Sequence, residues 1–211
     1  MKIAFLGHGK VGGALASGLA NAGHDVVLAA RDPESAGIKE GLARNERLRA
    51  KSIPEAVAEA EAVFLATPYS ANISALDSAG DLAGKILVDC TNPVGPGMQL
   101  SVGGSDSGGE TVQRLRPEAR VVKSFTIYGY ENFEDAAYPG YGDLRPAMLM
   151  CGNDPEAVAE VGELARDLGW EPVATGPIKM ARYLEPMTML WIEMARVQGR
   201  GPGFTWAMLK R

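Results

Sequence analysis

The sequence has few of the side chains that enzymes commonly use to bind metals or to transfer protons. It contains two histidines and two cysteines among 211 residues. Cys90 and Cys151 lie far apart in apolar runs, so they have neither the spacing of a metal site nor that of a redox pair. We therefore expect no metal site, and two reduced core thiols in a cytoplasmic protein.

An excess of basic charge is also missing. The chain has 21 Lys and Arg against 26 Asp and Glu, a net charge of −5. The basic residues between positions 44 and 51 alternate with Glu46, and no basic face for a phosphate backbone results. The apolar run Ile3–Leu6 is far shorter than a secretory segment of about 7–15 residues or a membrane span of about 20. The sequence predicts a protein that binds neither nucleic acid nor a membrane.

Glycine, by contrast, is abundant, with 26 residues, where a usual share of roughly 7% would give about 15. The apolar and charged fractions, 46% and 22%, are ordinary for a folded globular protein. These values exclude collagen, a disordered chain and a coiled coil, so the glycines need a local explanation.

Short apolar runs alternate with segments of helical spacing along the whole chain. The predicted strands are Lys2–Leu6, Asp25–Ala30, Ala62–Ala66, Lys85–Cys90, Arg120–Phe125, Ala147–Cys151 and Glu171–Ala174. The predicted helices are Gly13–Ala22, Pro33–Leu48, Ile53–Ala60, Ser70–Leu82, Pro155–Leu168 and Ala181–Val197. Gly23 is expected to end the first helix, and Asp154 to cap the fifth.

This alternation predicts an α/β fold, a doubly wound, mainly parallel Rossmann-type sheet with a short C-terminal helical extension. We expect one domain over residues 1–211. Residues 1–125 would form the dinucleotide-binding part. Residues 126–211 would form a smaller part that completes the active site and the dimer interface.

The motif Gly7-His8-Gly9-Lys10-Val11-Gly12 follows the first strand and opens the first helix. A glycine-rich loop in this position binds the pyrophosphate of a dinucleotide. Gly7 would make the tight turn, Gly9 would let the backbone approach the phosphates, and Gly12 would let the helix pack on the strand. We expect all six residues to bind cofactor, His8 mainly through its backbone.

Arg31 indicates NADP rather than NAD. An NAD enzyme places a carboxylate near the end of the second strand to bind the ribose hydroxyl, but Ala30 stands there. A 2′-phosphate would gain a charge-assisted partner from Arg31, whereas Asp32 would repel it if its side chain turned inward.

Two further strand ends carry polar residues before proline. Ala66 ends the third predicted strand and Thr67-Pro68 follows it, while Asn92 follows the fourth strand. Ligands of open α/β sheets bind beyond the carboxyl ends of strands, so we expect both loops to contact the nicotinamide and its ribose. Thr-Pro and Asn-Pro are equally ordinary places for a strand to stop.

Two loops are candidates for the second substrate. The glycine-rich stretch 95–109 is either a mobile lid or a plain surface loop. The aromatic residues after the fifth strand would either stack on a planar ring or form a small core of their own. They are Tyr128, Tyr130, Phe133, Tyr138 and Tyr141.

With these motifs the chain resembles the family of coenzyme F420-dependent NADP oxidoreductases and related small dinucleotide-binding reductases, over nearly its full length. The resemblance rests on the glycine loop and on the blocks at 23–31, 88–93, 120–125, 151–154 and 175–186. It implies hydride exchange between NADP(H) and a deazaflavin, with related members reducing flavins or ferric ions, and a homodimer. It also implies that the region after Phe125, with Thr126, Tyr128 and Gly129, shapes the acceptor pocket.

Hydride transfer between two stacked rings requires positioning rather than a catalytic acid or base, so no catalytic residue is assigned. His24 is expected to be structural. Two alternatives remain open. One is an NADP-dependent reductase of a small carbonyl or imine, which normally needs a larger helical domain. The other is a non-catalytic NADP(H)-binding redox sensor.

Overall fold

The computed structural model describes the whole chain, Met1–Arg211. Its main sheet has eight strands in the order β10-β9-β8-β5-β4-β1-β2-β3. Six run parallel; β9 pairs antiparallel with β8, and β10 runs parallel to β9. The strands are β1 Lys2–Leu6, β2 Asp25–Ala30, β3 Arg49–Ser52, β4 Ala62–Leu65, β5 Ile86–Asp89, β8 Arg120–Lys123, β9 Ala147–Gly152 and β10 Glu171–Ala174. The predicted fold class is confirmed.

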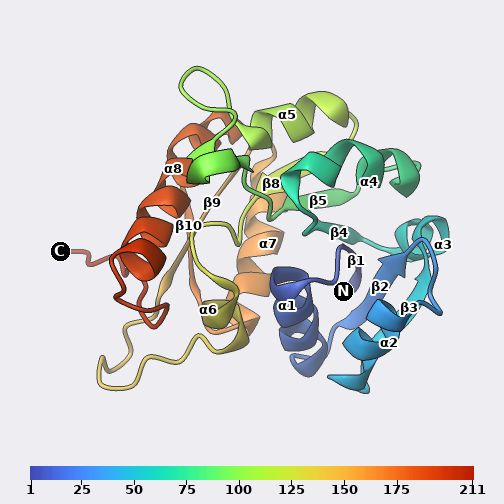
Figure 1. Cartoon of the computed structure of the whole chain (residues 1–211), viewed down its shortest axis with the longest axis horizontal. Coiled ribbons are helices and arrows are strands. Elements are labelled where there is room, and N and C mark those ends of the chain that lie inside the picture. Colours follow the sequence, from blue (N-terminus) through green and yellow to red (C-terminus); the bar gives the residue numbers. More distant parts are fainter.

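Helices cover both faces of this sheet. They are α1 Lys10–Asn21, α2 Ala36–Ala43, α3 Ile53–Glu59, α4 Asn72–Ala79, α5 Gly108–Leu115, α6 Tyr130–Glu134, α7 Pro155–Asp167 and α8 Ala181–Ile192. One apolar core contains residues of α1, α2 and α7, and a second contains residues of α3, α4 and α5. Figure 1 shows α8 on one side of the molecule and α2 and α3 on the other.

The predicted helix ends are confirmed where the signal is local. Gly23 follows α1 with φ +97°, a left-handed conformation that glycine adopts without strain. The Asp154 carboxylate accepts hydrogen bonds from the backbone N–H groups of Glu156 and Ala157 at the start of α7. Burial of both thiols, Cys90 and Cys151, is confirmed as well, and neither forms a disulfide.

Three segments differ from the sequence-based expectation. The helix expected over Pro33–Leu48 is confined to α2, and the polar strand β3 follows it at the edge of the sheet. Residues 95–109 are not one loop, because Val94–Gly95 (β6) pairs with Gln99–Leu100 (β7) and the last two glycines begin α5. The last helix ends at Ile192 and continues as a π-helical turn, Glu193–Val197.

None of the helices combines the length and the apolar character that crossing a bilayer requires.

Candidate dinucleotide-binding site

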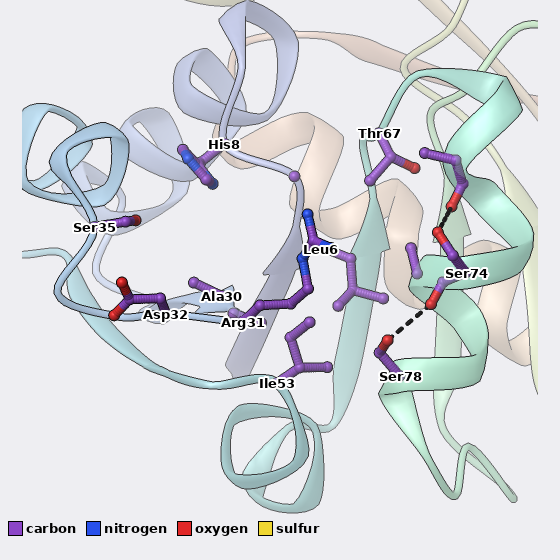
Figure 2. Close-up of a pocket in the computed structure, with 14 residues that line it drawn as sticks. Leu6, His8, Ala30, Arg31, Asp32, Ser35, Ile53, Thr67, Ser74 and Ser78 are labelled. Carbon is purple, nitrogen blue, oxygen red and sulfur yellow. Dashed lines mark hydrogen bonds between the residues drawn. The ribbon is translucent and has the colours of Figure 1, made fainter.

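The loops after β1, β2 and β4 meet at the carboxyl edge of the sheet and surround a cavity of about 350 Å³ (Figure 2). Four residues predicted from the sequence line it, namely Gly7, His8, Arg31 and Thr67. The structure adds residues from α3 and α4 and from the turn before α2. They include Ser35, Ile53, Ala71, Ser74 and Ser78.

The glycines of the first loop occupy positions that larger residues would disturb. Gly7 has φ +100°, and a Cβ atom there would lie 2.5 Å from the carbonyl oxygen of Ala66. A Cβ at Gly12 would lie 2.1 Å from the carbonyl oxygen of Gly7, so this glycine lets α1 pack against the loop. The fold itself therefore requires glycine at both positions.

Gly9 differs from these two glycines, because a Cβ atom there would meet nothing within 4 Å. It is the N-cap residue of α1, and no side chain caps this helix end. Unpaired N–H groups and the helix dipole favour an anion at such a position. The open space at Gly9 and the uncapped helix therefore fit the pyrophosphate of a dinucleotide.

Arg31 and Asp32 follow β2 and line the cavity. Arg31 is also exposed, so its guanidinium is available to a ligand. One oxygen of Asp32 accepts a hydrogen bond from the Glu34 N–H at 3.0 Å, which holds the carboxylate in the turn toward α2. Ser35, the N-cap residue of α2, also faces the cavity. A serine just before a helix is the sequence signal that indicates such a position.

The remaining loop residues lie around the start of α1. Lys10 is exposed, and its ammonium lies 4.7 Å from the centre of the Tyr130 ring. Val11 is half-buried in the first turn. Ala66 packs beside Gly12, whereas Pro68 is exposed and does not line the cavity.

Asn92 lies beyond β5 and outside the cavity lining. Its carboxamide oxygen accepts a hydrogen bond from the Thr126 hydroxyl at 2.6 Å, and its amide donates to the Thr126 carbonyl at 3.1 Å. The Thr188 hydroxyl of α8 donates to the same carbonyl at 2.8 Å. Asn92 therefore connects the loops after β5 and β8 with α8.

The three residues expected near an acceptor have different surroundings. Thr126 is buried with its hydroxyl on Asn92. Tyr128 is also buried; its hydroxyl donates to the Ala147 carbonyl at 2.8 Å, and its ring stacks on Trp170. The Tyr128 side chain thus belongs to the core. Gly129 is half-buried beside α8, and a Cβ there would lie 2.4 Å from the Trp191 ring.

The other aromatic residues divide in the same way. Phe133 packs edge-on against Phe125 in the core. Tyr138 accepts a hydrogen bond from the Asn132 amide, and Tyr141 is exposed. Tyr130 is half-buried under Lys10. Tyr130 and Tyr141 therefore keep surface that a planar ring could contact.

Sequence reasoning missed a buried ion cluster next to these loops. The Lys123 ammonium lies 2.9 Å from the carboxylates of both Asp89 and Glu185, and all three side chains are at most 1% exposed. Burial acts to lower the pKa of Lys123, but the two carboxylates raise it above its ordinary value. The sequence did contain a signal for this cluster, because each of the apolar strands β5 and β8 ends in a charged residue, Asp89 and Lys123.

His24 has the structural role expected for it. It precedes β2, and its Nε2 lies 3.0 Å from the Asp167 carboxylate at the end of α7. His8 is the other histidine, and it lies between the glycine loop and Gly37 of α2. The glycine loop, the uncapped start of α1 and the exposed Arg31 form an arrangement that is suited to holding and orienting a cofactor.

A family model described as "NADP oxidoreductase coenzyme F420-dependent" matches residues 2–93. The chain is 34% identical to a candidate F420-dependent NADP reductase from Arthrobacter sp. FB24 of known crystal structure. The two chains superpose with a TM-score of 0.89, each covered completely.

Two curated relatives are also similar. The F420-dependent NADP reductase of Methanothermobacter marburgensis is 29% identical over 214 residues, with 92% of each chain covered. The metalloreductase STEAP3 of Rattus norvegicus is 33% identical over 190 residues, 89% of this chain. The chain spans 36% of the length of that metalloreductase.

The open space at Gly9 generates a prediction. Gly9→Ala should leave the melting temperature within about 2 °C of wild type, because the new methyl group meets no protein atom. The same methyl group occupies the approach to the helix N-terminus, so NADPH affinity should fall by about tenfold or more. Calorimetric titration and thermal unfolding measure the two effects.

Gly13→Ala is the matched control, since its Cβ would make only an ordinary contact 3.6 Å from the His8 carbonyl oxygen. This control should bind NADPH like wild type. Unchanged NADPH affinity in Gly9→Ala would contradict the placement of the pyrophosphate.

Proposed function

The chain belongs to the family of coenzyme F420-dependent NADP oxidoreductases and is an NADP-dependent oxidoreductase, and we propose that it transfers hydride between NADP(H) and a flavin-like or deazaflavin acceptor such as F420. The observation that carries this proposal is the open space at Gly9, at the uncapped start of α1, together with a neighbouring cavity that Arg31 lines. Direct hydride transfer between two rings depends on positioning and needs no acid–base pair from the protein.

The cofactor end of the mechanism follows from the loop geometry. NADPH supplies the hydride when it is bound. The N-terminus of α1 would hold its pyrophosphate and Arg31 its 2′-phosphate. Thr67 would contact the sugar, beyond the end of β4. These contacts orient the cofactor, and orientation of two reacting rings can supply a large part of the rate enhancement.

The acceptor would lie on the other side of the nicotinamide, between the loops after β5 and β8. Asn92 and Gly129 line this region, together with the backbone at Thr126. Asn92 uses one amide hydrogen on the Thr126 carbonyl, which leaves the second free for an acceptor ring. Lys10 and Tyr130, which contact each other at the starts of α1 and α6, would contact the edge of a planar acceptor.

An acceptor screen tests the proposed reaction. Purified protein with NADPH is offered F420, FMN, riboflavin, a ferric chelate, and small carbonyl and imine compounds. The ferric chelate is included because one relative is named a metalloreductase. Turnover with F420 or a flavin supports the proposal. Turnover with a carbonyl or imine alone contradicts it, and tight NADPH binding without any turnover indicates a redox sensor.

Arg31→Ala tests the choice of NADP over NAD. Removing the guanidinium should weaken NADPH binding by about tenfold or more, because a charge-assisted contact to the 2′-phosphate is lost. NADH affinity should change by less than about twofold. Arg47→Ala is the matched control, because Arg47 is also exposed but does not line the cavity. Equal losses for the two cofactors would refute this role of Arg31.

The C-terminal part, residues 126–211, is proposed to complete the active site and to form a homodimer interface. Tyr183, Leu190 and Val197 recur every seven residues along α8 and the following turn, and each is more than half exposed. An apolar stripe of this kind is suited to packing on a second copy. A sedimentation experiment that found only monomer at micromolar concentration would exclude the dimer. The two free, buried thiols fit the cytoplasm as the proposed location.

A further inference from the structure

A series of hydrogen bonds connects the buried ion cluster to the cofactor cavity. Asp89 and Thr91 lie 2.7 Å apart, Thr91 and Asn72 2.9 Å, and Asn72 and Thr67 2.9 Å, measured between side-chain atoms. We call these four residues the relay. It begins at a fully buried carboxylate and ends at Thr67, which lines the cavity (Figure 2).

Each hydrogen bond of the relay has a defined direction. The Asp89 carboxylate can only accept, and it receives the Lys123 ammonium and both the N–H and the hydroxyl of Thr91. The single hydroxyl proton of Thr91 is therefore used on Asp89. Thr91 Oγ1 must then accept from Asn72, so the atom of Asn72 that faces it is the amide nitrogen.

This orientation of Asn72 determines what Thr67 can offer. The Asn72 carboxamide oxygen faces Thr67 and accepts its hydroxyl proton. Thr67 Oγ1 then has only lone pairs left for the cavity. A phosphate oxygen, which also only accepts, is excluded as its partner; a hydroxyl or an amide N–H is favoured.

We propose that the relay makes Thr67 an obligate hydrogen-bond acceptor for a ribose hydroxyl or the carboxamide N–H of the bound dinucleotide, with Asp89, Thr91 and Asn72 as positioning residues. This inference rests on the proposed function, since it assumes that the cavity binds NADP(H).

The buried ion cluster holds the start of the relay in place. Lys123 also donates to the Thr91 carbonyl, so Thr91 is held by Lys123 as well as by its two hydrogen bonds to Asp89. Glu185 accepts the N–H groups of Gly108 and Gly109 at 2.9 and 3.0 Å, which fastens α8 to the start of α5. The direction of the hydrogen bonds in the relay is therefore set at Asp89 and Lys123, which are buried away from water.

A double-mutant cycle between the two threonines tests this coupling. Thr67→Val removes the hydroxyl that is proposed to accept a hydrogen bond from the cofactor. Thr91→Val breaks the relay at a residue that reaches Thr67 only through Asn72 and does not line the cavity. Each should lower NADPH affinity and kcat/KM by about tenfold, the effect of one lost hydrogen bond at a bound ligand. The double variant should be no worse than Thr67→Val alone, because the relay acts only through Thr67.

Two controls separate positioning from a general loss of structure. Thr67→Ser keeps the hydroxyl and should restore binding to within about twofold of wild type. Thr175→Val removes a hydroxyl that donates to the Met150 carbonyl of β9. This strand lies near the β10 end of the sheet, away from the cavity at β1, β2 and β4. The Thr175→Val variant should leave NADPH affinity unchanged. If Thr91→Val does not fold, Asn72→Leu replaces it in the same cycle.

Losses that multiply to about a hundredfold in the double variant would overturn the relay, as would a folded Thr91→Val protein with wild-type affinity. In both cases wild-type NADPH binding would still support the proposed function. A wild-type protein that binds no dinucleotide would instead refute the proposed function, and the relay's role with it.

Discussion

The ammonium of Lys123, buried between the carboxylates of Asp89 and Glu185, is the interaction on which the rest of the carboxyl edge depends. Removing one partner of such a buried group leaves an uncompensated charge and typically costs about 3–5 kcal/mol. Two carboxylates against one ammonium leave an excess negative charge, and the backbone N–H groups at the start of α5 partly compensate it at Glu185. All three side chains must therefore keep their geometry together.

That geometry joins four elements that are distant in the sequence. Asp89 ends β5, Lys123 ends β8, and Glu185 belongs to α8, which it fastens to α5. The ends of β5 and β8 carry the loops that we assign to the acceptor. On the other side, the relay leads from Asp89 to Thr67 in the cofactor cavity. A single buried cluster thus supports both halves of the proposed active site.

How far the site could be predicted depended on whether its signals were local. The turn at Gly7 and the cap at Asp154 involve neighbours within a few residues, and both were recognisable in the sequence. The edge strand β3 was missed because only one of its four residues, Ala50, is apolar, so it shows no apolar alternation. The sequence left open whether the Tyr128 ring stacks on a ligand or packs in a core. The ring stacks on Trp170 and Trp206, which come much later in the chain.

The sequence by itself determined the fold class, the family resemblance and the phosphate loop, because strand periodicity and glycine spacing are properties of short segments. Only the tertiary structure decided which polar side chains meet. Asp89, Lys123 and Glu185 are separated by 34 and 62 positions in the chain, and nothing in their local sequence specifies that one ammonium must lie between the two carboxylates. Burial imposes that requirement, because a charge removed from water needs a partner of opposite charge, and the fold supplies this partner from distant parts of the chain.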